Sequence, residues 1–139
     1  MATPEKKTIT RSLMGPPFEP KTSTTALRIV DAAPRKVINV NVFAYEGAVG
    51  MTLKNQSAHP NPIHGTSAEG EDHPSTTRFI TGLFGVASEY GVKLDWINCG
   101  MCVDERGPAE WIDGPRRGGP PDLYDWYNES TNTLVIGTR

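Results

Sequence analysis

The two cysteines of the chain lie close together, in Cys99-Gly100-Met101-Cys102. A CxxC pair that follows a strand can supply half of a zinc site or carry out thiol–disulfide exchange. Redox catalysis favours a CxxC at the start of a helix, which lowers the thiol pKa. Here Asp104 and Glu105 follow at once, and their charges raise the pKa of a nearby thiol. We therefore expect two reduced, unreactive thiols. The alternative, a nucleophilic cysteine, remains as an enzymatic hypothesis.

A zinc site would need two ligands besides the cysteines, because structural zinc is four-coordinate. The histidines all lie in the polar stretch 55–75, at positions 59, 64 and 73. The candidate ligand set is Cys99, Cys102, His64 and His73. A zinc deaminase is excluded, because no histidine is followed two positions later by the glutamate that this reaction requires. Zinc is therefore kept as the alternative cofactor, and no other cofactor is expected.

Arginines and aromatic residues occur together near the C-terminus. Such a mixture suits stacking and phosphate contact with single-stranded nucleic acid. The candidate binding residues are Arg116, Arg117, Trp111 and Trp126. Asp113, Asp122 and Asp125 flank them and neutralise much of the local positive charge. Nucleic-acid binding is therefore only weakly supported.

Length and composition limit the protein to a small domain. The chain has 139 residues and a net charge of −2. A single domain is typical of this length, and the charge does not favour bulk electrostatic binding to nucleic acid or anionic lipid. No apolar run reaches the ~18–20 residues of a membrane span. No secretory signal is evident, so we expect a cytoplasmic or virion-associated protein.

The middle of the chain predicts one long helix followed by a strand. Ser75 is a typical N-cap, apolar residues follow at helical spacing as far as Tyr90, and Gly91 is placed to end the helix. Residues 92–97 then alternate as a core strand. The principal helix is expected at about 75–90.

The remaining patterned segments predict short strands. Residues 36–54 alternate on both sides of Glu46-Gly47 and predict a β-hairpin. A second hairpin is expected to join residues 123–127 to residues 133–136. Further short strands are predicted at 26–30 and 109–113. The expected fold is therefore α+β, with a mostly antiparallel sheet of β-hairpins packed on one helix.

The first 24 residues show neither helical nor strand periodicity. Prolines and threonines favour an extended backbone there. We therefore divide the chain into an extended or flexible N-terminal arm, 1–24, and a single domain, 25–139. An arm of this kind suits attachment to a neighbouring subunit.

No phosphate loop, dinucleotide fingerprint or nucleophile elbow is present. The sequence therefore favours a non-enzymatic protein that binds or assembles with a protein partner or with itself. The version we expect is a viral or phage structural or accessory protein, or a peripheral subunit of a larger complex. The alternative is a zinc-binding protein.

Overall fold

A five-stranded sheet forms the centre of the computed structural model, which describes residues 5–17, 21–57, 60, 65–67, 69, 75–107 and 109–137. The elements in chain order are β1 (Thr8–Leu13), α1 (Lys21–Arg35), β2 (Asn39–Ala44), η1 (Glu46–Thr52), α2 (Thr76–Glu89), β3 (Leu94–Cys99), α3 (Gly100–Arg106), β4 (Arg116–Gly118), α4 (Pro120–Glu129) and β5 (Asn132–Ile136). The strand order is β4-β3-β2-β1-β5. All four pairings between these strands are parallel.

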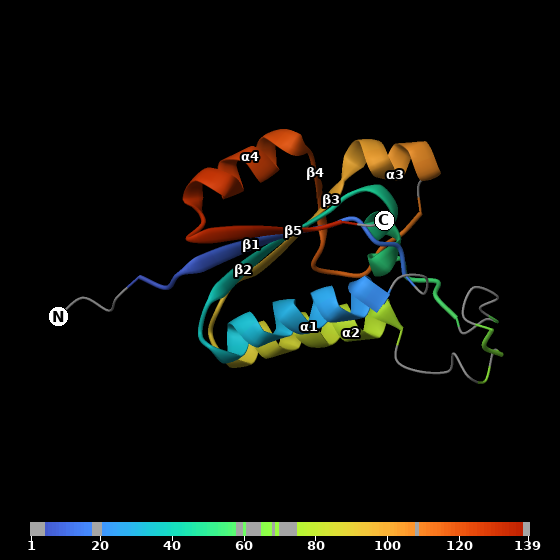
Figure 1. The fold of residues 1–139 in the computed structure, drawn as a ribbon, viewed down its shortest axis with the longest axis horizontal. Helices are drawn as coiled ribbons and strands as arrows, with labels where there is room; N and C mark the ends of the chain where they lie inside the picture. The colour runs from blue at the N-terminus through green and yellow to red at the C-terminus, as the bar shows by residue number, and fades with distance from the viewer. Residues whose placement is uncertain are drawn as a thin grey trace.

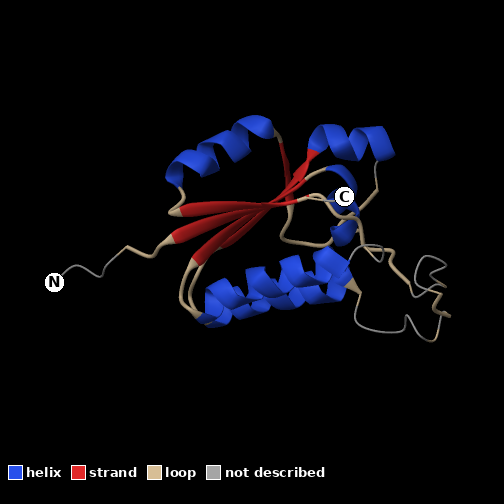
Figure 2. Ribbon diagram, viewed as in Figure 1, coloured by secondary structure: helices blue, strands red, loops and turns tan. Residues whose placement is uncertain are grey.

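Helices cover both faces of the sheet. The chain steps from β1 to β4 in one direction and then crosses back to place β5 on the other side of β1. Because crossovers between parallel strands are right-handed, reversing the direction puts the connecting helix on the opposite face. Accordingly, α1 and α2 lie on one face and α4 lies on the other (Figures 1 and 2). The short helix α3, which begins at the end of β3, lies on the same side as α4. The architecture is a three-layer, doubly wound α/β fold.

The expected α+β fold with antiparallel hairpins is therefore wrong. Parallel strands cannot be joined by tight turns and need crossover connections, usually helices. Residues 21–35 and 120–129 supply two of these helices. Residues 26–30 were expected to be a strand and lie inside α1. Ala26, Leu27 and Val30 are buried at helical spacing, but the preceding Lys-Thr-Ser-Thr-Thr is a poor helix former and obscures the pattern.

The N-terminal segment is not only an arm. Strand β1 lies between β2 and β5, and its register pairs Ile9 with Val40. The expectation of an unpatterned arm is wrong for residues 8–13. This strand alternates, but one of its faces is polar, so it resembles a solvent-facing tail in sequence. Thr10 and Ser12 are nevertheless fully buried on that face.

Neither predicted hairpin forms. After β2 the chain enters the 3-10 helix η1, and Glu46 at the turn adopts a positive φ of 52°. Residues 123–127 belong to α4, which starts at Pro120 and is capped where Asp122 Oδ2 accepts a hydrogen bond from Gly119 N at 2.8 Å. Pro at the first helical positions is a helix-start signal. The segment 109–113 contributes an isolated bridge between Trp111 and Leu53.

The long helix is confirmed. In α2 the side chain of Ser75 caps the first turn by accepting a hydrogen bond from Arg78 N. Gly91 follows the helix with φ +66°, a conformation that glycine adopts without strain. Strand β3 comes next, two residues later than predicted. The final strand, β5, contains the predicted 133–136.

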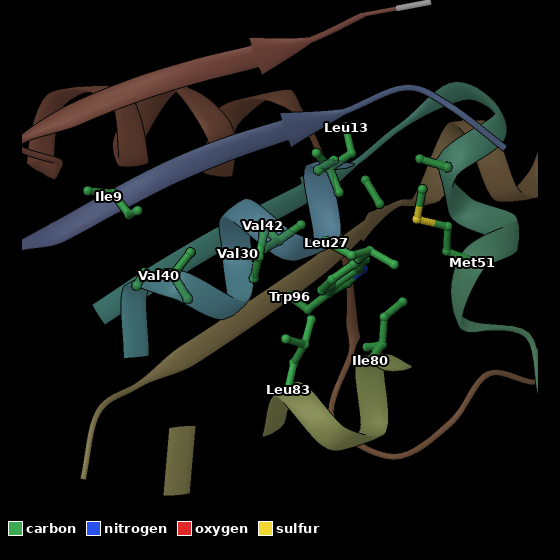
Figure 3. Close-up of a cluster of buried hydrophobic side chains, with 14 residues drawn as sticks. Ile9, Leu13, Leu27, Val30, Val40, Val42, Met51, Ile80, Leu83 and Trp96 are labelled. Atoms are coloured by element: carbon green, nitrogen blue, oxygen red, sulfur yellow. The ribbon is translucent and has the colours of Figure 1, made fainter. Parts of the chain in front are cut away.

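Two apolar clusters hold the layers together. The larger fills the space between the sheet and the helices α1 and α2, where side chains from both helices meet around Trp96 (Figure 3). The smaller lies on the opposite face and includes Phe43, Ile97 and Trp126 of α4. Both cysteines belong to this smaller cluster.

Candidate functional site

The two cysteines lie where β3 ends and α3 begins. Cys99 is the last residue of β3 and the N-cap of α3, and Cys102 lies in the first turn of that helix. Ligand and reaction sites of doubly wound sheets form at the carboxyl ends of the strands. The position of the CxxC pair therefore makes it the main candidate site.

The geometry of the helix start brings the two thiols together. Cys99 is the N-cap and Cys102 the third residue of α3, and their thiols lie close enough to share a hydrogen bond. Both are free cysteines and both are buried, with 5 % and 8 % of their surface exposed. Burial raises the pKa of the Cys102 thiol; a backbone hydrogen bond from Glu46 opposes the rise and a hydrogen bond shared with Cys99 adds to it.

Arg117 of β4 reaches across the start of α3. A Cβ atom placed on Gly100 would lie 2.5 Å from Arg117 Nε, so the guanidinium packs directly against the Gly100 backbone. Arg117 donates two hydrogen bonds to the Asp104 carboxylate, at 2.7 and 3.0 Å. These bonds hold the pKa of Asp104 below its usual range and raise the pKa of Arg117, to which the nearby Cys99 adds. Arg117 is thus the cation of the thiol site.

The end of β2 forms the other side of the site. Phe43 of β2 is paired with Ile97 of β3 in parallel register. The pairing ends at Ala44 and Asn98, and the next residue, Tyr45, lies at the same edge of the sheet and packs on the smaller cluster that contains both cysteines. Burial raises the pKa of the Tyr45 hydroxyl, and the neighbouring Tyr127, Glu46 and Cys102 add to this rise.

A second ion pair ties η1 to α3. Arg106 Nη2 donates to Glu46 Oε2 at 2.9 Å, and Arg106 Nη1 donates to the backbone carbonyl of Cys102 at 3.3 Å. The CxxC motif is therefore held from both of its sides, by Arg106 and Glu46 on one and by Arg117 on the other.

Only the two cysteines of the proposed zinc ligand set belong to the described residues. His64 and His73 lie outside the described residues. The described part of the chain contains no group of three or more His, Cys, Asp or Glu side chains placed to hold a metal ion. The zinc alternative stays a prediction that rests on the cysteines alone.

The other predicted binding residues have separate structural roles. Arg116 forms two hydrogen bonds with Asp95, at 2.9 and 3.0 Å. The indole of Trp111 donates to the carbonyl of Pro115, and Trp126 is buried in the smaller cluster. Stacking on nucleic acid stays a prediction to which this arrangement adds nothing.

Sequence reasoning located the cysteines and selected Arg117, although as a nucleic-acid contact, and it missed Tyr45 and Glu46. Tyr45 and Glu46 precede Cys99 by 54 and 53 residues along the chain, and Arg117 follows Cys99 by 18 residues and Cys102 by 15. They reach the thiols only because β2, β3 and β4 end at one edge of a parallel sheet. Without the strand order, the one available signal was Gly100, whose missing side chain makes room for Arg117.

Comparison with known proteins agrees with the fold. A model of the DsrE/DsrF-like family matches residues 7–136. The crystal structure of the YchN protein from E. coli is similar to this chain, with a TM-score of 0.68 over 94 % of this chain and 99 % of that one, at 20 % sequence identity. Comparison with curated proteins gives no match. Among the described helices, none is long and apolar enough to span a membrane.

Proposed function

The chain belongs to the DsrE/DsrF-like family, and we propose that it works as a sulfur carrier in which Cys99 holds a sulfur atom as a persulfide. The observation that carries this proposal is the thiol pair at the carboxyl edge of the sheet, beside the Arg117 guanidinium. This family gives no support to a viral or phage protein, so that expectation is dropped. A reducing compartment such as the cytoplasm suits the proposed thiol chemistry.

The reaction at Cys99 is a transfer of sulfane sulfur. The Cys99 thiolate attacks the outer sulfur of a donor persulfide, R–S–SH. A new S–S bond forms on Cys99 as the donor S–S bond breaks, and the donor leaves as the thiolate R–S⁻. The thiolate is the reactive form, and the guanidinium of Arg117 stabilises a negative charge at this position.

Cys99 suits the role of acceptor better than Cys102 does. Arg117 lies close enough to Cys99 for the two charges to interact. Burial raises the pKa of Cys102, and the nearby Glu46 adds negative charge beside it. Less of Cys102 is therefore thiolate near neutral pH than of an ordinary cysteine, which makes it a weak first nucleophile.

The donor must reach a thiol that is 5 % exposed. The pair of Arg117 and Asp104 lies against Gly100, the residue next to Cys99, and we infer that it covers the thiol; its side chains are 54 % and 58 % exposed. Exposed ion pairs contribute little to stability, so this cover can move aside without unfolding the domain. Between the cysteines, Met101 is 67 % exposed and offers an apolar contact to a donor protein.

The test is the uptake of sulfur from inorganic polysulfide by the reduced full chain. Intact-mass spectrometry should show wild-type protein and Cys102→Ser each accepting sulfur, and Cys99→Ser accepting much less. Iodoacetamide added first should block the uptake. Equal uptake by Cys99→Ser would contradict the assignment to Cys99, and no uptake by any form would contradict the carrier function.

The expected binding of protein partners fits this role, because a sulfur carrier transfers its sulfur atom to another protein. Exposed apolar side chains on α4 and β5 support it: Tyr124 is 67 % and Val135 is 51 % exposed. Light scattering of the full chain and of the Val135→Lys variant tests self-association through β5. A monomer in both cases would restrict the partner to another protein.

A further inference from the structure

Cys102 has no role in accepting or holding the sulfur in the proposed function, yet it lies against Cys99, which has both roles. Cys99 and Cys102 occupy the N-cap and third positions of α3, and both belong to the smaller apolar cluster. The two thiols share a hydrogen bond, so their sulfur atoms already lie close together. A bond between the two sulfur atoms is therefore compatible with the backbone as it stands.

We propose that Cys102 is a resolving cysteine, which attacks the Cys99 persulfide and releases the carried sulfur as hydrosulfide. The inference rests on the proposed function, because it needs a persulfide on Cys99. It adds a second outcome for the cargo: besides transfer to a partner, the sulfur atom can leave as free HS⁻ from the protein itself.

The atoms and electrons of this step balance. Cys99–S–S⁻ and Cys102–SH give the Cys99–Cys102 disulfide and HS⁻. The Cys102 sulfur bonds to the inner sulfur of the persulfide, the inner–outer S–S bond breaks, and the Cys102 proton leaves on the outer sulfur. That outer sulfur gains two electrons, one from each cysteine sulfur. A dithiol reductant then returns the disulfide to two thiols and completes the cycle.

The surroundings of the pair favour this order of events. Burial raises the pKa of Cys102 and favours its protonated form, so Cys102 competes little for the donor. The same proton is then available for the leaving sulfur. Because both cysteines are buried in one cluster, the attack is intramolecular and needs no access from solvent.

The experiment compares sulfide release by wild-type protein and by Cys102→Ser. Reduced full chain is loaded with inorganic polysulfide and desalted, and both free sulfide and intact mass are then followed. Wild-type protein should release one hydrosulfide per chain and end lighter than the reduced form by two hydrogens. Cys102→Ser should keep the mass of one added sulfur, with a persulfide lifetime longer by at least about tenfold.

Two further variants separate chemistry from packing. Cys102→Ala removes the thiol without adding a hydroxyl and should behave as Cys102→Ser does. Val103→Ala disturbs the same buried helix, where Val103 is 7 % exposed, and should release sulfide as wild-type protein does. Release should also speed up with rising pH in wild-type protein, as the Cys102 thiol ionises, and this dependence should be absent from both Cys102 variants.

The outcomes distinguish the inference from the proposed function. Wild-type protein that keeps its persulfide as long as Cys102→Ser would overturn the resolving role and leave the carrier function standing. Slow release from Val103→Ala, matching that of Cys102→Ser, would assign the effect to packing and also overturn it. Failure of every form to take up sulfur would remove the carrier function and the inference together.

Discussion

Gly100 keeps the Arg117 guanidinium over the thiol site. The nearest guanidinium atoms would lie 2.5–2.7 Å from a Cβ at this position, well inside contact distance. The obstructing group is the far end of a flexible, half-exposed side chain, so it can move away at small cost. The role of Gly100 is therefore to place a charge and not to stabilise the fold.

Gly100→Ala should displace Arg117 with little change in melting temperature. The displaced guanidinium no longer binds Asp104, so the pKa of Asp104 should rise toward its ordinary value of 3.8. Sulfur uptake by Cys99 should fall, because the thiolate loses its nearby cation. Carboxyl NMR titration and polysulfide loading measure the two effects. An Asp104 that titrates as in wild-type protein would contradict this role for Gly100.

Gly82→Ala is the matched control for that substitution. No described atom lies within 4 Å of a Cβ at Gly82, which is exposed inside α2. Alanine is about 0.5–1 kcal/mol more favourable than glycine within a helix, so this variant should be more stable than wild-type protein. It should leave both the Asp104 pKa and sulfur uptake unchanged.

Among the elements, β1 shows how a central strand can resemble a tail. Its inward residues Ile9 and Leu13 join the larger cluster, while its other face carries Thr10 and Ser12. The Thr10 hydroxyl is hydrogen-bonded to Ser130, and Asn41 donates to it at 3.5 Å. Buried polar residues such as Thr10 and Ser12 cannot be distinguished from solvent-facing ones by their spacing in the sequence. The local sequence was therefore enough to predict α2, whose capping residues and apolar residues are neighbours in the sequence. It was not enough to predict β1.

Leu13→Ala tests the position of β1 within the sheet. Leu13 is 1 % exposed, and truncating a buried leucine costs about 2–5 kcal/mol. Leu134→Ala in the neighbouring edge strand β5 makes the same chemical change where the side chain is 44 % exposed, and should cost far less. Urea unfolding of the two variants gives the comparison. Equal, small losses would mean that the N-terminal segment is the loose arm first expected.

Across the whole molecule, the two faces of the sheet are packed differently. Aliphatic side chains and Trp96 fill the face under α1 and α2, whereas α4 covers buried polar residues and is anchored by Trp126. Regions with fewer buried apolar contacts open at lower free energy than the global unfolding. The α4 face should therefore open first, and it is the face that contains both cysteines.

Opening of α4 should therefore provide a second route to the thiols, besides the movement of the Arg117–Asp104 pair. Trp126→Ala removes a side chain that is 7 % exposed and should loosen α4 by about 3–5 kcal/mol. Amide exchange in α4 and iodoacetamide labelling of the cysteines should accelerate together. The exchange rate of α2 amides should change only as much as the global free energy of unfolding changes. Tyr124→Ala on the same helix, where the side chain is 67 % exposed, should change neither rate. Labelling that stays slow while α4 exchanges faster would show that the thiols are reached past Arg117 and Asp104, with α4 in place.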